Sequence, residues 1–451
     1  MSRSNSESVV TESAPSLLVG AATTDITPDS SVFLYGYPHV PRMSTGVHDR
    51  LECGALYLGS ALGQCLFLAV EVIYVPQGIV TEIRGRISAA TGVPAEAILV
   101  GASHTHSGPV MAKVVSNGAD PVVPPPDSGY LQFFADRVVA AGISAVRGAV
   151  MAEVGLVSAT AEGVGTNRHD PKGPTDREVP VLVARSISRG EILACLVIYG
   201  MHTTVLHEDS TLISGDFPHF MRALLRRSVL PADCPVLFFQ GASGNQSPRH
   251  VTQANTFAEA RRIGEILGSA VAQAIGAITW RRDVSIWTKG TRIALEPRQF
   301  PSEPDADAAV LSARGRWERL RAEGAPRQAV RSAECDVFGA EETAELARAV
   351  FDGRLAGAIA ACSPAEVQVL GIGPWKFVAW PGEFFVEYAL ELKRRSSDTF
   401  LITLANGELQ GYIVTPEAAE RRVYESTNAV FAAENGPRFI EATMQLLAGK
   451  R

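Results

Sequence analysis

Two histidines separated by one threonine end an apolar run in the sequence ILVGASHTHSGP, which spans residues 98–109. Imidazole nitrogens bind zinc and exchange protons near neutral pH, so His104 and His106 are candidate metal ligands or catalytic bases. Residues two apart on a strand share a face, and both rings could therefore look into one crevice. A single histidine at a strand end is more often a hydrogen-bonded structural residue, so other parts of the chain must support a functional interpretation.

Further apolar runs also end in polar residues. They end at His202, at a glycine-rich loop carrying Asn245, Ser247 and Arg249, at Pro381-Gly382-Glu383, and at a loop carrying Glu408 and Tyr412. In α/β proteins the ends of strands converge on one crevice, so segments distant in the sequence can meet there. Two imidazoles, a carboxylate and a phenol make a nitrogen and oxygen donor set suited to zinc.

Each of these residues also has a purely structural interpretation. Glu383 would stabilise the N-terminus of the helix that follows it, Ser247 before proline is typical of a turn, and Tyr412 could be a packed aromatic residue. Other catalytic motifs are missing, because the chain has no HExxH and its GASGN departs from the GxSxG of α/β-hydrolases. Only the residues taken together favour a metal site.

The elements that must position these residues alternate between strands and amphipathic helices. Residues 54–75 predict a β-hairpin, residues 78–92 a helix closed by glycine, and residues 97–103 a buried strand leading to the histidines. Residues 256–278 show the clearest helical pattern of the chain, with capping-box spacing at its start. A second hairpin is expected about Gly373-Pro374. This alternation predicts an α/β (mixed α+β) fold of mixed β-sheets layered with helices.

No compositional break divides the chain into independent domains. Residues 1–16 are polar and predict a disordered N-terminus, whereas residues 17–451 predict a single domain. Residues from about 303 to 360 are rich in Ala, Arg and Glu, which indicates a helical excursion on the outside of the main fold. The proline-rich segment 116–129 is more typical of a substrate-side loop or lid than of a linker.

The composition argues against several classes of function. The formal net charge is -7 at pH 7 and no basic face is evident, so we expect no nucleic-acid partner. The six cysteines form no CxxC pair, which argues against a disulfide framework and a cysteine-rich zinc site. The N-terminus lacks the apolar core of a signal peptide, and no run is long enough for a transmembrane segment. We therefore expect a cytoplasmic protein.

Several segments, in their order along the chain, resemble the neutral/alkaline (non-lysosomal) ceramidase family. SHTHSGP, residues 103–109, is close to a signature of that family. The other matching segments are the early residues 25–49, Asn167-Arg168, His202, GNQSPR around Ser247, PGE ending at Glu383, and GYIVTPEAAERRVYE over residues 411–425. The resemblance covers residues from about 18 to 435. It implies that residues 17–451 form a ceramidase-like catalytic domain, without the C-terminal immunoglobulin-like domain of typical members.

The resemblance also implies a Zn2+ cofactor and a role for each of the candidate residues. The implied zinc ligands are His104, His202, Glu383 and Tyr412. The residues implied to line the amide site are Ser247, His106, Arg168 and Tyr424. The family reaction is hydrolysis of an N-acyl amide, typically of ceramide to sphingosine and a fatty acid. We therefore expect a zinc-dependent hydrolase in which a zinc-activated water attacks the amide beside Ser247, with attack by Ser247 itself as the other possibility.

Departures from the family pattern concern the substrate more than the metal. The chain has Asn245 and Arg249 where the family usually has Asp and Asn, and Thr203 follows His202 where proline is common. If Arg249 points into the pocket, it would suit an anionic acyl or amino-acid group better than a sphingoid base. The resemblance thus implies a lipid or small-molecule N-acyl amide as the substrate. The alternatives are hydrolysis or reverse synthesis of a small non-lipid amide, and non-catalytic binding on a degenerate ceramidase fold.

Overall fold

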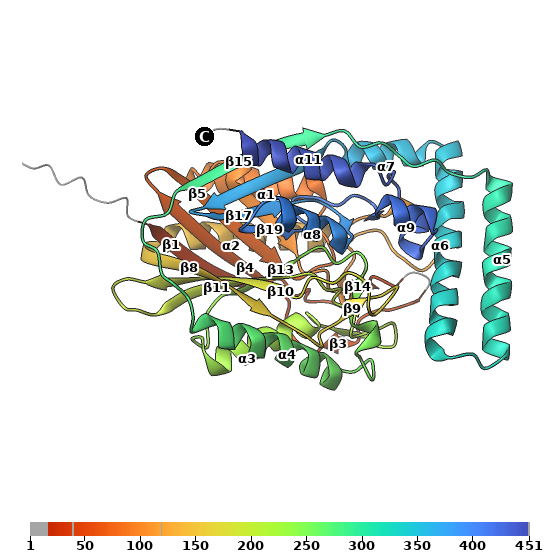
Figure 1. Ribbon diagram of the computed structural model, residues 1–451, viewed down its shortest axis with the longest axis horizontal. Coiled ribbons are helices and arrows are strands. Elements are labelled where there is room, and N and C mark those ends of the chain that lie inside the picture. Colours follow the sequence, from red (N-terminus) through yellow and green to blue (C-terminus); the bar gives the residue numbers. More distant parts are fainter. Residues whose placement is uncertain (1–16, 38–39, 119, 450–451) are drawn as a thin grey trace, which may run out of the picture.

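The computed structural model describes residues 17–37, 40–118 and 120–449, and the expected disordered segment, residues 1–16, lies outside the described residues. Strands and helices alternate along the described chain, as in a mixed α/β fold (Figure 1). The α-helices in these residues are α1 (Gln77–Thr91), α2 (Ser128–Arg147), α3 (Phe217–Ser228), α4 (Phe257–Ile275), α5 (Glu303–Ala322), α6 (Arg327–Phe351), α7 (Arg354–Cys362), α8 (Val386–Arg395), α9 (Pro416–Glu420), α10 (Tyr424–Asn428) and α11 (Asn435–Ala448).

Two larger sheets and four short strand pairs make up the β-structure of the described chain. The larger sheet has the order β13 (Val236–Gln240), β11 (Ile192–Tyr199), β10 (Glu178–Ser186), β8 (Val150–Thr160), β1 (Leu18–Asp25), β4 (Glu52–Ser60), β5 (Gly63–Val70) and β6 (Ile98–Ala102). The smaller sheet has the order β15 (Ile286–Ile293), β16 (Ala365–Ile372), β17 (Trp375–Ala379) and β19 (Thr399–Ile402). The short pairs are β2 (Leu34–Tyr35) with β7 (Gly108–Pro109), β3 (Gly46–Val47) with β12 (Leu212–Ile213), β9 (Thr166–Asn167) with β14 (Gln246–Ser247), and β18 (Glu383–Phe384) with β20 (Tyr412–Ile413).

The two sheets pack face to face, and helices cover their outer faces. Alternation along each strand produces this arrangement: in β10, Leu182 joins the core between the sheets, while Val181 and Val183 pack against α3 and α4. The rings of Phe67 and Phe377 meet across the sheets with centroids 5.3 Å apart. Helices α1 and α2 also cover the larger sheet, and α8 and α11 cover the smaller one. The predicted fold of layered mixed sheets and helices is confirmed.

Several elements lie where the sequence predicts them. Strands β4 and β5 form an antiparallel hairpin, as do β16 and β17. Helix α1 ends at Gly92, which has the left-handed φ of 77° that glycine tolerates. At the start of α4, Thr256 Oγ1 accepts a hydrogen bond from the Glu259 amide, but the Glu259 carboxylate accepts from Gln253 N at 2.8 Å. Only half of the expected capping box is therefore formed.

The larger sheet curls until its edge strands, β6 and β13, contact each other. The segment that follows β19 joins both edges, because Thr403 N donates to Gln240 O at 2.8 Å and Asn406 N donates to Val100 O at 2.8 Å. Strands β5 and β6 run parallel, as do β11 and β13. The loops that follow β6, β11, β13 and β19 consequently meet at one end of the molecule.

Three helices, α5, α6 and α7, occupy residues 303–362, and α5 and α6 stand as an antiparallel pair at the end of the sheets where β9 and β14 lie (Figure 1). Ion pairs join the two helices, including Arg316 with Asp336 at 2.6 Å and Arg348 with Asp307 at 2.5 Å. The segment was expected on the outside of the main fold. It does extend outward, but α6 also packs against α10 and so reaches the end where the loops meet.

Two further properties bear on the class of protein. All six cysteines lie within the described residues and none is in a disulfide; five of them are buried. Among the helices of the described chain, none combines the length and apolar character needed to cross a membrane.

Candidate active site

His104 leaves the strand that precedes it. Strand β6 ends at Ala102, and His104 has a φ of 66°, in the left-handed region that non-glycine residues rarely adopt. The prediction that the two rings meet because they lie two positions apart on one strand is therefore wrong, since both histidines follow the end of β6. A strained turn brings the two rings together instead, with His106 Nε2 at 3.3 Å from His104 Nε2.

His104 and His202 are oriented in the same way. The Nδ1 of His104 lies 2.9 Å from Ile73 O, and the Nδ1 of His202 lies 2.8 Å from Ser243 O. Because a carbonyl oxygen only accepts hydrogen bonds, each Nδ1 carries the hydrogen. Both rings are buried, and each presents its Nε2 to the interior of the site. Histidines that bind metals are usually oriented by such a contact from the other ring nitrogen.

The carboxylate of Glu383 faces both Nε2 atoms. Its Oε2 lies 3.2 Å from His104 Nε2 and 3.0 Å from His202 Nε2. Burial raises the pKa of Glu383, but the two imidazoles outweigh this effect and hold the pKa well below its usual range. Burial, together with the guanidinium of Arg168, lowers the pKa of His202 to about 4. Near neutral pH the ionised carboxylate of Glu383 therefore faces a neutral His202 imidazole.

These three atoms fit a bound cation. Glu383 Oε2 and His202 Nε2 are both buried without a hydrogen-bond partner among the described residues, and both are acceptors. Two acceptors at 3.0 Å repel each other unless a cation lies between them. Two donor atoms that each lie about 2.0–2.1 Å from a tetrahedral zinc are roughly 3.3 Å apart, so the observed separations suit a shared metal. A metal ion can also be held by the group of His104, His106 and His202, whose ligand atoms all lie within 4.8 Å of one another.

His106 differs from the other two histidines in its environment. Its Nδ1 is buried and has no hydrogen-bond partner in the described part of the chain, so no carbonyl orients this ring. The ring packs instead against Tyr37, with centroids 5.2 Å apart, and against the backbone of Gly36. Burial and the neighbouring His104 lower the pKa of His106 well below its usual value. The environment of His106 therefore favours a neutral ring whose Nδ1 has no partner in the described part of the chain.

Tyr412 lies beside Glu383 because β18 and β20 pair in parallel, with these two residues in register. The tyrosine ring stacks 6.4 Å from the ring of His202, and the guanidinium of Arg168 lies 5.3 Å from its centroid. Burial and the nearby Glu383 carboxylate raise the pKa of Tyr412 well above its ordinary value. The four residues implied as zinc ligands are thus neighbours in the structure.

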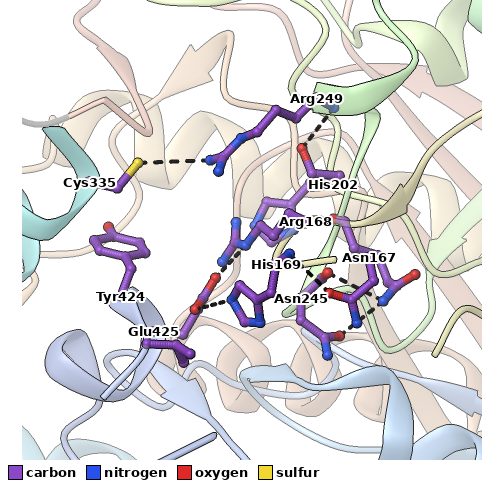
Figure 2. A network of polar contacts seen from close by, with 12 residues as sticks. Asn167, Arg168, His169, His202, Asn245, Arg249, Cys335, Tyr424 and Glu425 are labelled. Carbon is purple, nitrogen blue, oxygen red and sulfur yellow. Dashed lines mark hydrogen bonds and ion pairs between the residues drawn. The ribbon is translucent and has the colours of Figure 1, made fainter. Parts of the chain in front are cut away.

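Arg168 is fixed by an acidic residue that the sequence did not single out. Its Nε donates to the Glu425 carboxylate, whose other oxygen lies 2.7 Å from His169 Nε2, as Figure 2 shows. Burial raises the pKa of Glu425, but Arg168 outweighs it, and the pKa falls to about 2. The Nη2 of Arg168 is buried and lacks a hydrogen-bond partner among the described residues. The Nη2 group of Arg168 is therefore available to donate to a ligand.

Ser247 lies on β14, in a loop that neighbouring segments hold tightly. The Asn245 side chain accepts a hydrogen bond from Val386 N at 2.9 Å and donates one to Glu387 at 2.9 Å, so it ties this loop to the start of α8. The Ser247 hydroxyl accepts from Arg249 N at 3.1 Å. Thr203, the other departure from the family pattern, donates its hydroxyl to His104 O and so joins the two histidine loops. Asn245 and Thr203 thus serve the architecture of the site.

A cavity of about 180 Å³ unites the candidate residues. Its lining includes the predicted residues His106, Arg168, His202, Ser247, Tyr412 and Tyr424. The ring of Tyr424 lies 6.3 Å from that of Tyr412, and burial raises the pKa of Tyr424 well above its ordinary value. His104 and Glu383 contact His202, with the two imidazole centroids 4.7 Å apart and Glu383 Oε2 3.0 Å from His202 Nε2. All eight predicted residues therefore gather at one place.

Sequence reasoning missed the residues that α6 and the loop after β11 contribute to this cavity. They are Glu208, Arg331, Glu334, Cys335 and Phe338, which line the cavity together with His207. Glu425 and His169 were missed as well, although each directly follows a predicted residue, and that adjacency was the available signal. Nothing in the helical pattern of residues 327–351 distinguishes the turn that faces the cavity from the rest of α6. Arg249, whose orientation the sequence left open, does line the cavity.

Of the comparisons with known proteins, the one with solved structures identifies the fold. No model of a known protein family matches the sequence, and no curated protein matches it. Among solved structures, neutral ceramidase from Pseudomonas aeruginosa aligns with a TM-score of 0.73 and 17% sequence identity, over 96% of this chain and 74% of that chain. A structure described as ceramidase complexed with C2 aligns with a TM-score of 0.71 and 16% identity, over 95% and 74% of the two chains. The expected similarity to the neutral ceramidases is therefore confirmed for the fold.

Proposed function

We propose that the protein is a zinc-dependent amidase that hydrolyses an N-acyl amide bond. The observation that carries this proposal is the meeting of His104 Nε2 and His202 Nε2 with Glu383 Oε2, at 3.2 and 3.0 Å, beside a buried cavity. Unpartnered acceptors of this kind suit a cation. The shared fold with structures named as ceramidases supports amide hydrolysis as the reaction class.

In this proposal His104, His202, Glu383 and Tyr412 hold the metal. A buried set of nitrogen and oxygen donors would favour zinc over magnesium or calcium, which prefer oxygen ligands. Zinc, when bound there, supplies Lewis-acid polarisation of the amide carbonyl and lowers the pKa of a coordinated water.

The residues around the cavity would then act on the amide itself. The free Nη2 of Arg168 and the hydroxyl of Tyr424 are donors for the negative charge that develops on the carbonyl oxygen. His106, a neutral ring with an unpartnered nitrogen, can take up the proton of the attacking water and pass it to the leaving nitrogen. The hydroxyl of Ser247 orients the amide. Water adds to the carbonyl carbon, the C–N bond breaks, and an acid and an amine are released.

Two classes of substrate deserve direct comparison. Ceramide is one, because the structural relatives are named ceramidases. A small, polar N-acyl amide is the second, and the lining of the cavity favours it, since Arg249, Arg331 and Glu334 are charged. The apolar chain of a sphingoid base would bind weakly to this charged lining, because its burial there would remove the hydration of the charged groups.

The proposal is tested by metal analysis and by hydrolysis assays on the purified protein. We expect about one zinc per chain and release of free acid from at least one member of a panel of long-chain ceramides, N-acyl amino acids and short aryl amides. His202→Ala should lose both the zinc and the activity, whereas Ser247→Ala should keep the zinc and lose turnover. An active protein without metal, or a zinc-loaded protein that cleaves no amide in the panel, would contradict the proposal.

A further inference from the structure

Three arginines line the cavity, and two of them have carboxylate partners. Arg168 pairs with Glu425, whose side chain is almost completely buried. Arg331, on α6, lies 2.7 Å from Glu334 and 3.3 Å from Glu208. The positive charges of these two side chains are therefore already balanced within the protein.

Arg249 is the third arginine, and within the described residues no carboxylate lies at ion-pairing distance from it. Its Nη2 contacts Cys335 Sγ at 3.8 Å, a weak acceptor that leaves most of the guanidinium donors free. Figure 2 shows the side chain reaching from its backbone toward Cys335, on the same side as the ring of Tyr424. A half-buried cation without a partner is costly, so an anion that enters the cavity would gain this charge as its partner.

Arg249 also lies between two adjoining cavities. A second cavity of about 390 Å³ adjoins the first, and both are lined by His207, Glu208, Arg249, Arg331 and Glu334. The backbone of Arg249 is fixed, because its N–H donates to Ser247 Oγ at 3.1 Å. An amide placed beside Ser247 and the metal-binding atoms would therefore extend one of its two halves past the guanidinium into the outer cavity.

We infer that the site takes amides that carry a carboxylate, and that Arg249 binds this carboxylate. The inference rests on the proposed amidase function and names its substrate class. A guanidinium matches a carboxylate with two parallel hydrogen bonds, which gives both affinity and orientation. The carboxylate can belong to the amine half, as in an N-acyl amino acid, or to the acyl half, as in a monoamide of a dicarboxylic acid.

The test uses two matched pairs of amides with the zinc-loaded enzyme. One pair is an N-acyl amino acid and the corresponding N-acyl amino alcohol, and the other is an ω-carboxyacyl anilide and its ω-hydroxy analogue. We expect kcat/KM to be roughly 10- to 100-fold higher for the charged member of one pair, since a charge-assisted contact is lost in its neutral analogue. The pair that shows this preference identifies the half of the substrate that carries the carboxylate.

Two variants distinguish a direct contact between Arg249 and the substrate carboxylate from a general electrostatic attraction of the anion to the cavity. Arg249→Gln should reduce the ratio of kcat/KM for charged over neutral substrate to near one. Arg327→Gln removes the same charge from the outer cavity alone and should leave the ratio close to that of the wild type. The inference would be overturned if both variants lowered this ratio equally, or if the ratio of the wild type were near one. Neither result would count against amide hydrolysis.

Binding of the same four compounds, measured by calorimetry, keeps the two proposals distinguishable. Tighter binding of the charged compounds that is lost in Arg249→Gln supports the inference even where turnover is slow. Failure of the wild type to cleave any of the four counts against the proposed function instead. Equal affinity for charged and neutral compounds counts against the role of Arg249.

Discussion

At the scale of single residues, two histidines that are two positions apart have different surroundings. His104 Nδ1 is held by Ile73 O, so its Nε2 is fixed toward Glu383. His106 Nδ1 has no partner in the described part of the chain, and its ring is held by packing against Tyr37 and by the contact of its Nε2 with His104 Nε2. This difference favours His104 as a metal ligand and His106 as a group that acts on the substrate, because ligand histidines are usually oriented through their second nitrogen.

The division between these histidines predicts different zinc contents for two variants. His106→Ala should retain about one zinc per chain and lose roughly 10²- to 10⁴-fold in kcat, the usual contribution of acid–base catalysis. Glu383→Ala should lose the zinc, because it removes the carboxylate that faces both His104 and His202. Elemental analysis and initial-rate assays would measure the two effects, with His207→Ala, another cavity-lining imidazole, as the control. Zinc lost from His106→Ala and kept by Glu383→Ala would show that the three imidazoles form the ligand set.

At the scale of elements, short strand pairs place the side chains that the large sheets cannot reach. The β2–β7 pair sets Leu34 opposite Pro109, which brings the turn at Gly36 against the ring of His106. Gly36 has a φ of 125°, and a Cβ there would lie 2.3 Å from His106 Nδ1. Only glycine fits this position, for both conformational and steric reasons.

Gly36→Ala is therefore expected to displace His106 without disturbing the metal-binding atoms. Overpacking and the positive φ should lower the free energy of unfolding by about 1–3 kcal/mol, and kcat should fall while the zinc content is unchanged. Gly85→Ala is the matched control, because a Cβ at Gly85 in α1 meets no atom within 4 Å. We expect it to leave kcat unchanged and to stabilise the helix by about 0.5–1 kcal/mol. Thermal denaturation and rate measurements would check both variants, and an undiminished rate in Gly36→Ala would contradict the packing argument.

The sequence predicts elements well where a local pattern determines them. The hairpin at residues 54–75, helix α1 and helix α4 follow from hydrophobic periodicity and end signals that lie within each segment. The left-handed turn at His104 could not be predicted in this way, because contacts from distant loops impose it on a residue that does not favour it.

The same distinction between local patterns and distant contacts applies to the site residues. His104, His202 and Glu383 could be predicted because each lies a few residues after a strand, within a recognisable motif. Arg331 and Glu334 were not, because their place in the cavity depends on how α6 packs against the body of the protein. Such tertiary packing does not change the hydrophobic periodicity of the helix, so the sequence pattern does not reveal it.

At the scale of the whole molecule, the candidate ligands come from segments that only the complete arrangement of sheets brings together. His104 follows β6, His202 follows β11, and Glu383 follows β17 of the other sheet. Thr403 and Asn406 join the two edges of the larger sheet and so close the end where these loops meet. A metal bound at this place would link both sheets and would bind the folded state alone.

Removal of zinc should therefore destabilise the whole protein. A ligand that binds only the folded state stabilises it by about 3–4 kcal/mol when its free concentration is 100- to 1,000-fold above Kd. We expect treatment with a chelator to lower Tm, and added zinc to restore it, in differential scanning calorimetry. His104→Ala should have a lower Tm that no longer responds to either treatment. A wild-type Tm that is insensitive to the chelator would exclude a structural contribution from the metal.

The closure of the larger sheet by residues 403–406 also sets an order of events during protein synthesis. His104 and His202 emerge from the ribosome long before the segment that brings their loops together, whereas Glu383 emerges shortly before this segment and Tyr412 shortly after it. The earlier residues can form local hairpins and helices while translation continues, but they cannot form the site. The arrangement proposed to bind the metal can therefore form only when nearly the whole chain has been translated, and a nascent chain that stalls before Glu383 would expose His104 and His202 without the carboxylate that faces them.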